Sequence, residues 1–263
     1  MCLILFGIDI TPDIPFILAA NRDEFYARPT RAMAFWPESP DILAGRDLQA
    51  GGTWFGVSRP GRFAALTNYR DLTRIKADAP SRGEIIPDAL GFPGSVPAYL
   101  SRLDSWASQY SGFNLLAGEA GGEVYWYSNI TREIKRVPPG FHGLSNAFLD
   151  TPWPKVALGR QLLEEAVRNT FPDEDALFAL LSDTGRPPDG DLPDTGVGLE
   201  WERILSPLFI RSDTYGTRSS TLMHAGAPGE IRVTERTWED GSHRETRDRS
   251  FTLHPASRRN KPD

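Results

Sequence analysis

The chain has 263 residues, 40% of them hydrophobic and 24% charged, with a formal net charge of −6. These proportions are typical of a globular protein, and the length allows one large hydrophobic core. An acidic chain without a stripe of lysine and arginine argues against a nucleic-acid-binding surface, and no apolar run approaches the roughly 18 residues of a membrane helix.

The first half of the chain is rich in runs of branched and aromatic residues that are typical of β-strands. Residues 96–110 instead repeat apolar side chains at roughly helical spacing. Prolines and glycines recur between residues 28 and 52, so we expect mostly loop there. The strands that these patterns predict cover residues 2–10, 16–20, 53–58, 62–67, 113–117 and 124–128.

The second half contains the clearest helical pattern, over residues 153–171, and a shorter one over residues 175–181. Residues 185–198 are rich in glycine and proline and predict a loop. Further strands are expected over residues 134–137, 141–144, 219–225, 231–238 and 246–253. Strands followed by helices and again by strands favour a layered α+β fold. We therefore predict a single domain over residues 1–253 and a disordered polar tail over residues 254–263.

Cys2 is the only cysteine, and it directly follows Met1. Removal of Met1 would leave the thiol and a free α-amine on one residue, and an amine with a pKa of about 7.7–8.0 can accept the thiol proton. Nucleophile and general base would then be the same residue. The alternative is a small buried residue of the first strand. One cysteine forms no internal disulfide, and the N-terminal residues lack the pattern of a secretory signal, so we expect a cytoplasmic location.

Four consecutive polar residues, Asn21, Arg22, Asp23 and Glu24, follow the predicted strand over residues 16–20. If the first two strands form a hairpin, this cluster returns close to Cys2. An arginine there would lower the thiol pKa by favouring the thiolate, and an aspartate could orient the α-amine. The alternative interpretation is a charged turn where a strand meets solvent.

Other polar positions could complete a site. Asn68 and Asn146 each end an apolar stretch, where an asparagine amide can donate to a developing oxyanion or simply cap a turn. Residues 51–54, which end in Trp54, begin with two glycines and suit a backbone close to substrate. Arg218 lies among hydroxyl residues, so it binds a carboxylate or phosphate or belongs to a surface turn.

Metal and nucleotide sites have little support in the sequence. The four histidines are widely separated, and no CxxC pair or HxxxH pair is present. No GxGxxG or P-loop motif occurs, and no CxxCH haem-attachment motif either. We therefore predict no metal site and no required cofactor.

Taken together, the motifs resemble the NRDE family, also called the transport and Golgi organisation protein 2 family. The resemblance runs in order along most of the chain. It rests on residues 1–4, 18–29, 51–56, 65–70, 81–84, 112–115, 143–147, 151–155 and 215–218.

That family resembles the N-terminal nucleophile hydrolases, which implies a four-layer αββα sandwich with two antiparallel sheets between helices. In the branch of that group that contains bile-salt hydrolase and penicillin acylases, an N-terminal cysteine attacks an amide or ester carbonyl, an arginine and an aspartate tune it, and an asparagine helps to form the oxyanion hole. The resemblance implies catalytic roles for Cys2, Arg22, Asp23 and Asn146. For substrate binding we predict Asn21, Glu24, Trp54, Asn68 and Arg218.

Two functions of different classes follow. The first is a hydrolase or acyltransferase that acts on an amide or thioester through an acyl-enzyme on Cys2. The alternative is a non-catalytic binding or trafficking protein for haem or acyl-coenzyme A, because family members have been linked to haem trafficking and lipid metabolism. The expected partners are a small-molecule amide, an acyl thioester or haem, with no nucleic acid and no membrane span. A retained Met1 would favour binding over catalysis.

Overall fold

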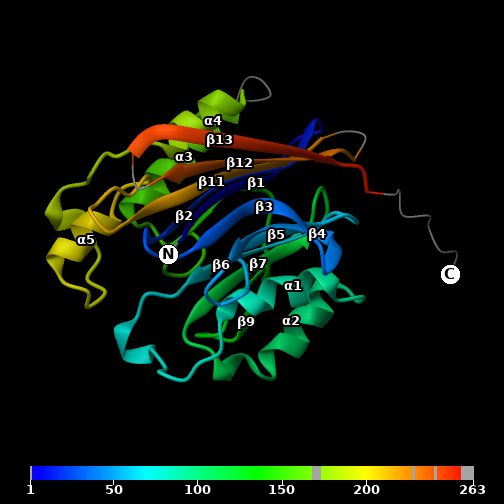
Figure 1. The fold of residues 1–263 in the computed structure, drawn as a ribbon, viewed down its shortest axis with the longest axis horizontal. Coiled ribbons are helices and arrows are strands. Elements are labelled where there is room, and N and C mark those ends of the chain that lie inside the picture. The colour runs from blue at the N-terminus through cyan, green and yellow to red at the C-terminus, as the bar shows by residue number, and fades with distance from the viewer. Residues whose placement is uncertain (1, 168–172, 227–228, 240–241, 256–263) are drawn as a thin grey trace, which may run out of the picture.

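The computed structural model describes residues 2–167, 173–226, 229–239 and 242–255, and within them two antiparallel β-sheets pack face to face (Figure 1). Sheet A has the strand order β10-β1-β2-β11-β12-β13, and sheet B runs in chain order from β3 to β9. The strands of sheet A are β1 (Cys2–Thr11), β2 (Ile14–Phe25), β10 (Gly140–Leu144), β11 (Tyr215–Ala225), β12 (Ile231–Glu239) and β13 (Ser242–Leu253). The strands of sheet B are β3 (Thr30–Trp36), β4 (Ser39–Asp47), β5 (Phe55–Ser58), β6 (Arg62–Asn68), β7 (Phe113–Glu119), β8 (Val124–Ser128) and β9 (Glu133–Arg136).

Helices cover the outer faces of both sheets (Figure 1). In the figure, α3 and α4 lie against sheet A, while α1 and α2 lie against sheet B. The layers therefore follow the order α, β, β, α, and the predicted layered α+β fold is confirmed. The α-helices of the described residues are α1 (Ile85–Gly91), α2 (Val96–Asp104), α3 (Pro154–Val167), α4 (Glu174–Leu181) and α5 (Leu199–Leu205).

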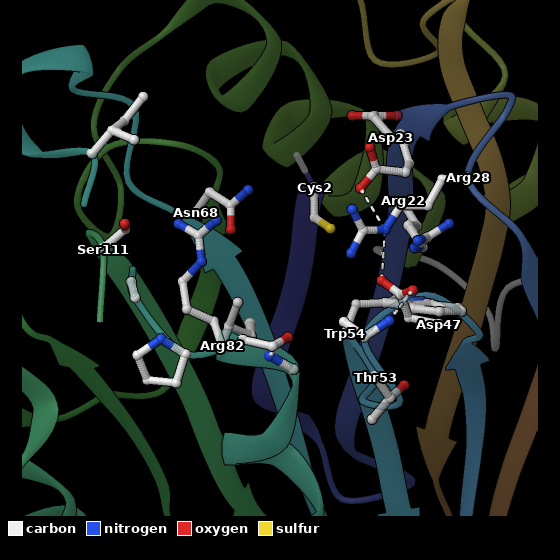
Figure 2. Close-up of a pocket in the computed structure, with 18 of the residues that line it drawn as sticks. Cys2, Arg22, Asp23, Arg28, Asp47, Thr53, Trp54, Asn68, Arg82 and Ser111 are labelled. Carbon is white, nitrogen blue, oxygen red and sulfur yellow. Dashed lines mark hydrogen bonds and ion pairs between the residues drawn. The ribbon is translucent and has the colours of Figure 1, made fainter. Parts of the chain in front are cut away.

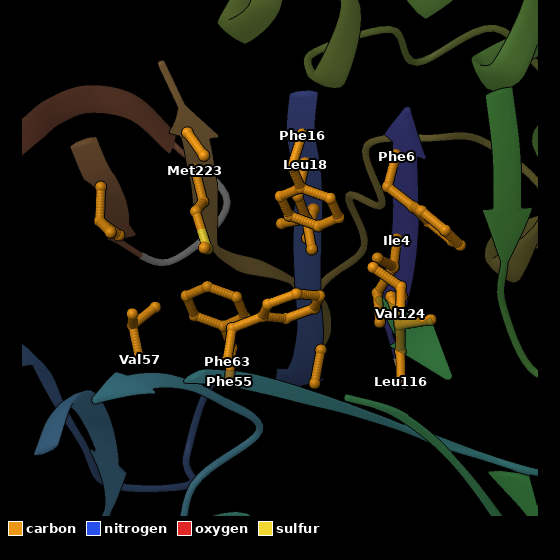
Figure 3. Packing of buried hydrophobic residues seen from close by; sticks show 14 of the residues in the cluster. Ile4, Phe6, Phe16, Leu18, Phe55, Val57, Phe63, Leu116, Val124 and Met223 are labelled. Atoms are coloured by element: carbon orange, nitrogen blue, oxygen red, sulfur yellow. The ribbon is translucent and has the colours of Figure 1, made fainter. Parts of the chain in front are cut away.

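The main core fills the space between the two sheets. Figure 3 shows Phe16 and Leu18 of sheet A facing Phe55 and Phe63 of sheet B. The rings of Phe16 and Phe63 lie 4.6 Å apart between centroids. Successive residues of a strand point to opposite faces, so Ile17 belongs to a second core, between sheet A and its helices. Because both faces are buried, β1 and β2 read as continuous apolar runs.

The predicted loop over residues 28–52 is wrong in large part, because β3 and β4 form a hairpin there. Pro29 precedes β3, Pro37 lies in the turn and Pro40 is near the start of β4, so each proline stands at a strand end. The strand interiors carry the buried Met33 and Leu43. The frequency of prolines and glycines obscured two short strands.

Two other strand boundaries and two helices differ from the prediction. β2 continues through the polar cluster as far as Phe25, and β11 begins at Tyr215, before the predicted start of that strand. The helices α1 and α5 had not been predicted. Residues 168–171 of the predicted long helix, and residues 256–263 of the predicted disordered tail, lie outside the described residues.

Glu235 of β12 is a buried carboxyl between the sheets. It is 1% exposed, and its Oε1 accepts a hydrogen bond of 2.6 Å from the Met33 backbone N–H. Burial raises its pKa from 4.5 to about 7. The folded state therefore keeps a proton that the unfolded state loses, and this group costs stability as the pH rises through that interval.

We expect Glu235→Gln to remove this cost. The variant's free energy of unfolding minus that of the wild type should increase by about 3 kcal/mol from about pH 4 to about pH 8. The wild type loses this stability because its Glu235 pKa is about 2.5 higher in the folded state, at 1.36 kcal/mol for each pKa unit, and glutamine does not titrate. Denaturant unfolding at the two pH values measures the change. Glu230→Gln, the same substitution at a partly exposed position just before β12, is the control. Parallel pH profiles for the two variants would contradict the prediction.

Candidate active site

A cavity of about 430 Å³ lies at the N-terminal end of β1, and the Cys2 thiol projects into it (Figure 2). One wall comes from the end of β2, and another from residues 75–83. Charged side chains of both signs line it. These seven side chains are Arg22, Asp23, Glu24, Arg28, Asp47, Lys76 and Arg82.

Cys2 lies directly opposite Arg22 in the β1–β2 pair, as the predicted hairpin requires. Burial raises the pKa of the thiol above its usual value of 9.0. The positive charge of Arg22 and a hydrogen bond from the Asp23 backbone act in the opposite direction but do not outweigh burial. Arg22 therefore lowers the thiol pKa as expected, but burial keeps the net shift upward. The resting thiol stays protonated, and nucleophilic attack requires a base.

Arg22 stacks on Trp54, with its guanidinium carbon 4.1 Å from the ring centroid. Its Nη1 also donates a 3.2 Å hydrogen bond to the Thr30 hydroxyl. The ring of Trp54 needs a glycine at position 45, because a Cβ at Gly45 would lie 2.5 Å from it. The predicted residues Arg22 and Trp54 thus form one rigid wall of the Cys2 cavity.

Asp23, next to Arg22 in β2, is buried, and its Oδ1 accepts a 2.7 Å hydrogen bond from the Thr217 hydroxyl of β11. Burial raises the pKa of Asp23, and the positive charge of Lys155 opposes that rise. Lys155 is itself buried in α3 and donates a 3.0 Å hydrogen bond to the Leu205 carbonyl. Burial lowers the Lys155 pKa to about 8. Lys155 is therefore a buried cation whose charge acts on the predicted catalytic residue Asp23.

Glu24 belongs to a chain of ion pairs that lines one side of the cavity. Its carboxylate is 3.8 Å from Arg28 Nε, and the same nitrogen donates to Asp47 at 2.7 Å. Arg28 is therefore held by two carboxylates. The predicted residue Glu24 does line the cavity, within a wall whose charges largely compensate one another.

Asn21 and Arg218 are not brought into this cavity. The Asn21 amide donates to the Leu181 and Leu208 carbonyls at 2.8 and 2.9 Å, which ties the end of α4 to β2. Arg218 donates through Nη1 to three backbone carbonyls of residues 25–28 and braces that turn. Substrate binding by these two residues stays a prediction.

The two asparagines predicted for the oxyanion lie next to each other. Asn68 lines the cavity, whereas Asn146 is fully buried behind it. The Asn146 amide donates to the Asn68 carbonyl at 2.9 Å, and its Oδ1 accepts a 3.3 Å hydrogen bond from Arg70. Arg70 in turn forms a buried ion pair of 2.7 Å with Glu202 of α5. A buried polar network therefore fixes the backbone of Asn68.

Arg82 reaches the cavity because two backbone segments approach closely. Thr53 donates its N–H to the Gly83 carbonyl at 3.0 Å, and a Cβ at Gly52 would lie 2.4 Å from the Gly83 backbone. We had expected the glycines at residues 51–52 to bring backbone close to substrate. Gly52 instead allows contact with Gly83, and this contact places Arg82 in the cavity wall.

Sequence reasoning missed several residues of the site. Arg28, Asp47, Lys76 and Arg82 line the cavity, and Lys155 lies behind Asp23. Arg28, Arg82 and Lys155 lie in segments on which the family resemblance rests, and that was the available sequence signal for them. Isolated basic residues in loops have no spacing pattern that separates them from ordinary surface residues.

Within the described part of the chain, no group of three or more histidine, cysteine, aspartate or glutamate side chains is arranged to hold a metal ion. Among the same residues, no helix combines the length and apolar character needed to cross a membrane.

The family model described as Transport and Golgi organisation 2 matches residues 1–240. The Transport and Golgi organization protein 2 homolog of Homo sapiens is 38% identical over 275 residues, which cover 96% of this chain and 99% of that protein. The Bos taurus homolog is also 38% identical, over 92% of this chain and 98% of its own. The Drosophila melanogaster protein of the same name is 29% identical over 90% of this chain and 92% of its own.

Two solved structures share the fold. A Caenorhabditis elegans N-acylethanolamine-hydrolyzing acid amidase ortholog matches with a TM-score of 0.53 at 14% identity, over 87% of this chain and 94% of its own. A mutant of the conjugated bile acid hydrolase from Clostridium perfringens matches with a TM-score of 0.51 at 8% identity, over 97% and 98%. Both are N-terminal nucleophile hydrolases, so the predicted αββα fold of that type is confirmed. At these identities the likeness concerns the fold alone.

Proposed function

The chain belongs to the Transport and Golgi organisation 2 family, and we propose that it is a hydrolase or acyltransferase that forms an acyl-enzyme on Cys2. The proposed substrates are small amides or thioesters. The observation that carries the proposal is the placement of the thiol in a polar cavity, opposite Arg22 and beside the buried Asp23. The names of the two solved neighbours, an amidase and a bile acid hydrolase, support this class of reaction by analogy.

The reaction we propose begins with removal of Met1, which frees the Cys2 amine. The neutral amine takes the thiol proton while the sulfur attacks the carbonyl carbon of the substrate. A carbon–sulfur bond forms, and the bond to the amine or thiol leaving group breaks. The leaving group receives the proton from the α-ammonium. Water, or another acceptor, then takes the acyl group and restores the thiol.

The raised thiol pKa supports the need for this base. A thiol that is not ionised at rest reacts only if its proton is removed during attack. An α-amine with a pKa of about 7.7–8.0 is partly neutral near pH 7 and is attached to the same residue. In this proposal Asp23 accepts a hydrogen bond from the amine, and Lys155 favours the ionised form of Asp23.

Two asparagines are the candidates for the oxyanion. Asn68 lines the cavity with Cys2, and Asn146 remains the residue that the resemblance implies. Removing one such donor costs about 3–4 kcal/mol of transition-state stabilisation in a well-studied hydrolase. The hydrogen bond from Asn146 to the Asn68 carbonyl couples the positions of the two residues.

The binding alternative uses the same cavity but finds less support there. Iron in haem takes histidine, cysteine, methionine or tyrosine ligands, and Cys2 is the one such side chain among the described lining residues. Cavities for large organic ligands are mostly apolar, whereas seven charged side chains line this one. The lining therefore favours the enzyme over a haem carrier.

Acetyl transfer from p-nitrophenyl acetate tests the proposal. Intact mass first establishes that the protein lacks Met1, and peptide mapping then locates the acetyl group. We expect one acetyl group on Cys2, formed as p-nitrophenol is released and later removed by water as acetate, and no such adduct in the Cys2→Ala variant. Absence of the adduct from protein shown to lack Met1, or equal p-nitrophenol release by the variant, would rule out the mechanism.

A further inference from the structure

We propose that Arg82 binds an anionic group of the substrate, so that the natural substrate carries a carboxylate, sulfonate or phosphate beside its reactive carbonyl. The proposal rests on the proposed function in taking Cys2 as the reacting group. It follows from the distribution of charge around the Cys2 cavity and from the bonding of Arg82.

The charges of the cavity are separated between its walls. The lining carboxylates, Asp23, Glu24 and Asp47, come from β2 and from the end of β4. The wall of residues 75–83 contributes the cations Lys76 and Arg82 to the lining, and no carboxylate. A substrate bound between these walls therefore meets paired charges of both signs on one side and only positively charged side chains on the other.

The other two lining arginines already have partners within the protein. Arg28 pairs with Asp47 and Glu24, and Arg22 stacks on Trp54 and donates to Thr30. Lys76 is exposed, and its ammonium group donates to the Ser108 carbonyl. Among the three lining arginines, these interactions leave the guanidinium of Arg82 most available to a ligand.

Arg82 makes one hydrogen bond, from Nη1 to the Gly112 carbonyl at 2.9 Å, and forms no ion pair among the described residues. Nε and Nη2 therefore remain for a ligand. Figure 2 shows the side chain extending from its wall toward Asn68, on the side of the cavity where Cys2 projects. A guanidinium presents paired N–H groups that match the two oxygens of a carboxylate, sulfonate or phosphate.

The cavity also strengthens the attraction. Burial lowers the pKa of Arg82, while the negative charges of Glu24 and a Cys2 thiolate raise it. The partly desolvated guanidinium therefore interacts with charge at the reacting sulfur. Removal from bulk water increases the strength of an ion pair with a bound anion. The contact between Gly52 and Gly83 holds the backbone that carries this charge.

A pair of thiol reagents with opposite charges tests the proposal without any need for turnover. The sulfonatoethyl and trimethylammonioethyl methanethiosulfonates each transfer a thioalkyl group to a thiol and release methanesulfinate. Because Cys2 is the only cysteine, intact mass reports its reaction alone. The quantity measured is the ratio of the anionic to the cationic rate constant, divided by the same ratio for N-acetylcysteine.

We expect Arg82→Gln to lower this ratio about tenfold, as electrostatic steering of a charged reagent by one nearby group implies. Arg82→Lys should keep most of it, and thermal melting establishes that both variants are folded. Arg59→Gln removes the same charge from an exposed position after β5, where Arg59 pairs with Asp41 at 3.7 Å, and should leave the ratio unchanged. An unchanged ratio in Arg82→Gln, or an equal fall in Arg59→Gln, overturns the proposal.

This result is distinguishable from failure of the proposed function. A protein with an Arg82-dependent ratio but no acetyl adduct on Cys2 has the anion site and lacks the acyl-transfer chemistry. A protein that forms the adduct, with a ratio insensitive to Arg82, has the chemistry and lacks the anion site.

Discussion

Protein that carries an N-terminal extension ahead of Cys2 is expected to form its acyl-enzyme about 10²–10⁴ times more slowly than protein that begins at Cys2, the usual contribution of a general base. The extension converts the α-amine into an amide, which cannot accept the thiol proton. Burial raises the thiol pKa, so few molecules hold a thiolate that could react without the base. The p-nitrophenyl acetate assay measures the acylation rate.

The control is the same preparation after a protease has removed the extension and left Cys2 as the first residue. Iodoacetamide alkylation of Cys2 is measured in parallel, because an extension that only blocks the cavity slows both reactions. We expect a much larger effect on acylation than on alkylation. Equal acylation rates before and after cleavage would show that another group removes the thiol proton.

Replacing Glu202 by leucine is expected to lower the free energy of unfolding by about 3–5 kcal/mol, as removal of one partner of a buried ion pair usually does. Its Oε2 accepts from Arg70 Nη1 at 2.7 Å, and both side chains are 4% exposed. Its Oε1 accepts from the Thr195 backbone at 2.9 Å. The substitution leaves the Arg70 charge buried, with Asn146 Oδ1 as its remaining side-chain acceptor among the described residues.

Glu200→Leu provides the matched control, because it makes the same change at an exposed position of the same helix. Exposed substitutions of this kind usually change stability by no more than about 0.5 kcal/mol. In the double variant with Arg70→Met, part of the loss should return, since no buried charge is then left unpaired. Denaturant unfolding compares the variants, and a similar effect of Glu202→Leu and Glu200→Leu would contradict the prediction.

The two predictions address different parts of one site. The extension tests the chemistry at Cys2 itself. Glu202 tests the network that runs through Arg70 and Asn146 to the backbone of Asn68. If that network positions the oxyanion donors, Glu202→Leu should slow acylation while leaving iodoacetamide alkylation nearly unchanged.

Much of the sheet structure could be predicted from local sequence. The runs over residues 2–10 and 16–20 are apolar because both faces of β1 and β2 are covered, and a short turn makes them antiparallel neighbours. The polar cluster was misread as the end of a strand. Asn21, Arg22 and Asp23 lie within β2, because each finds partners that only the folded chain supplies.

The sequence by itself determined the one thiol of the chain and its cross-strand neighbour. Cys2 is the only thiol, and pairing of the first two strands brings Arg22 opposite it. Family motifs extended this to the fold, since the family match over residues 1–240 covers the elements from β1 to β12. These features depend on residue type and on spacing within a short stretch of chain, and a sequence displays both directly.

Only the tertiary structure decided the electrostatics of the site. The sign of the thiol pKa shift depends on burial by segments distant in the chain, and burial outweighs the charge of Arg22. The place of Arg82 depends on the contact between Gly52 and Gly83, and that of Lys155 on the packing of α3 against sheet A. Desolvation and charge both act through space, so no local pattern carries them. The protonated thiol of Cys2 and the available cation of Arg82 emerged only once the sheets and helices had been assembled.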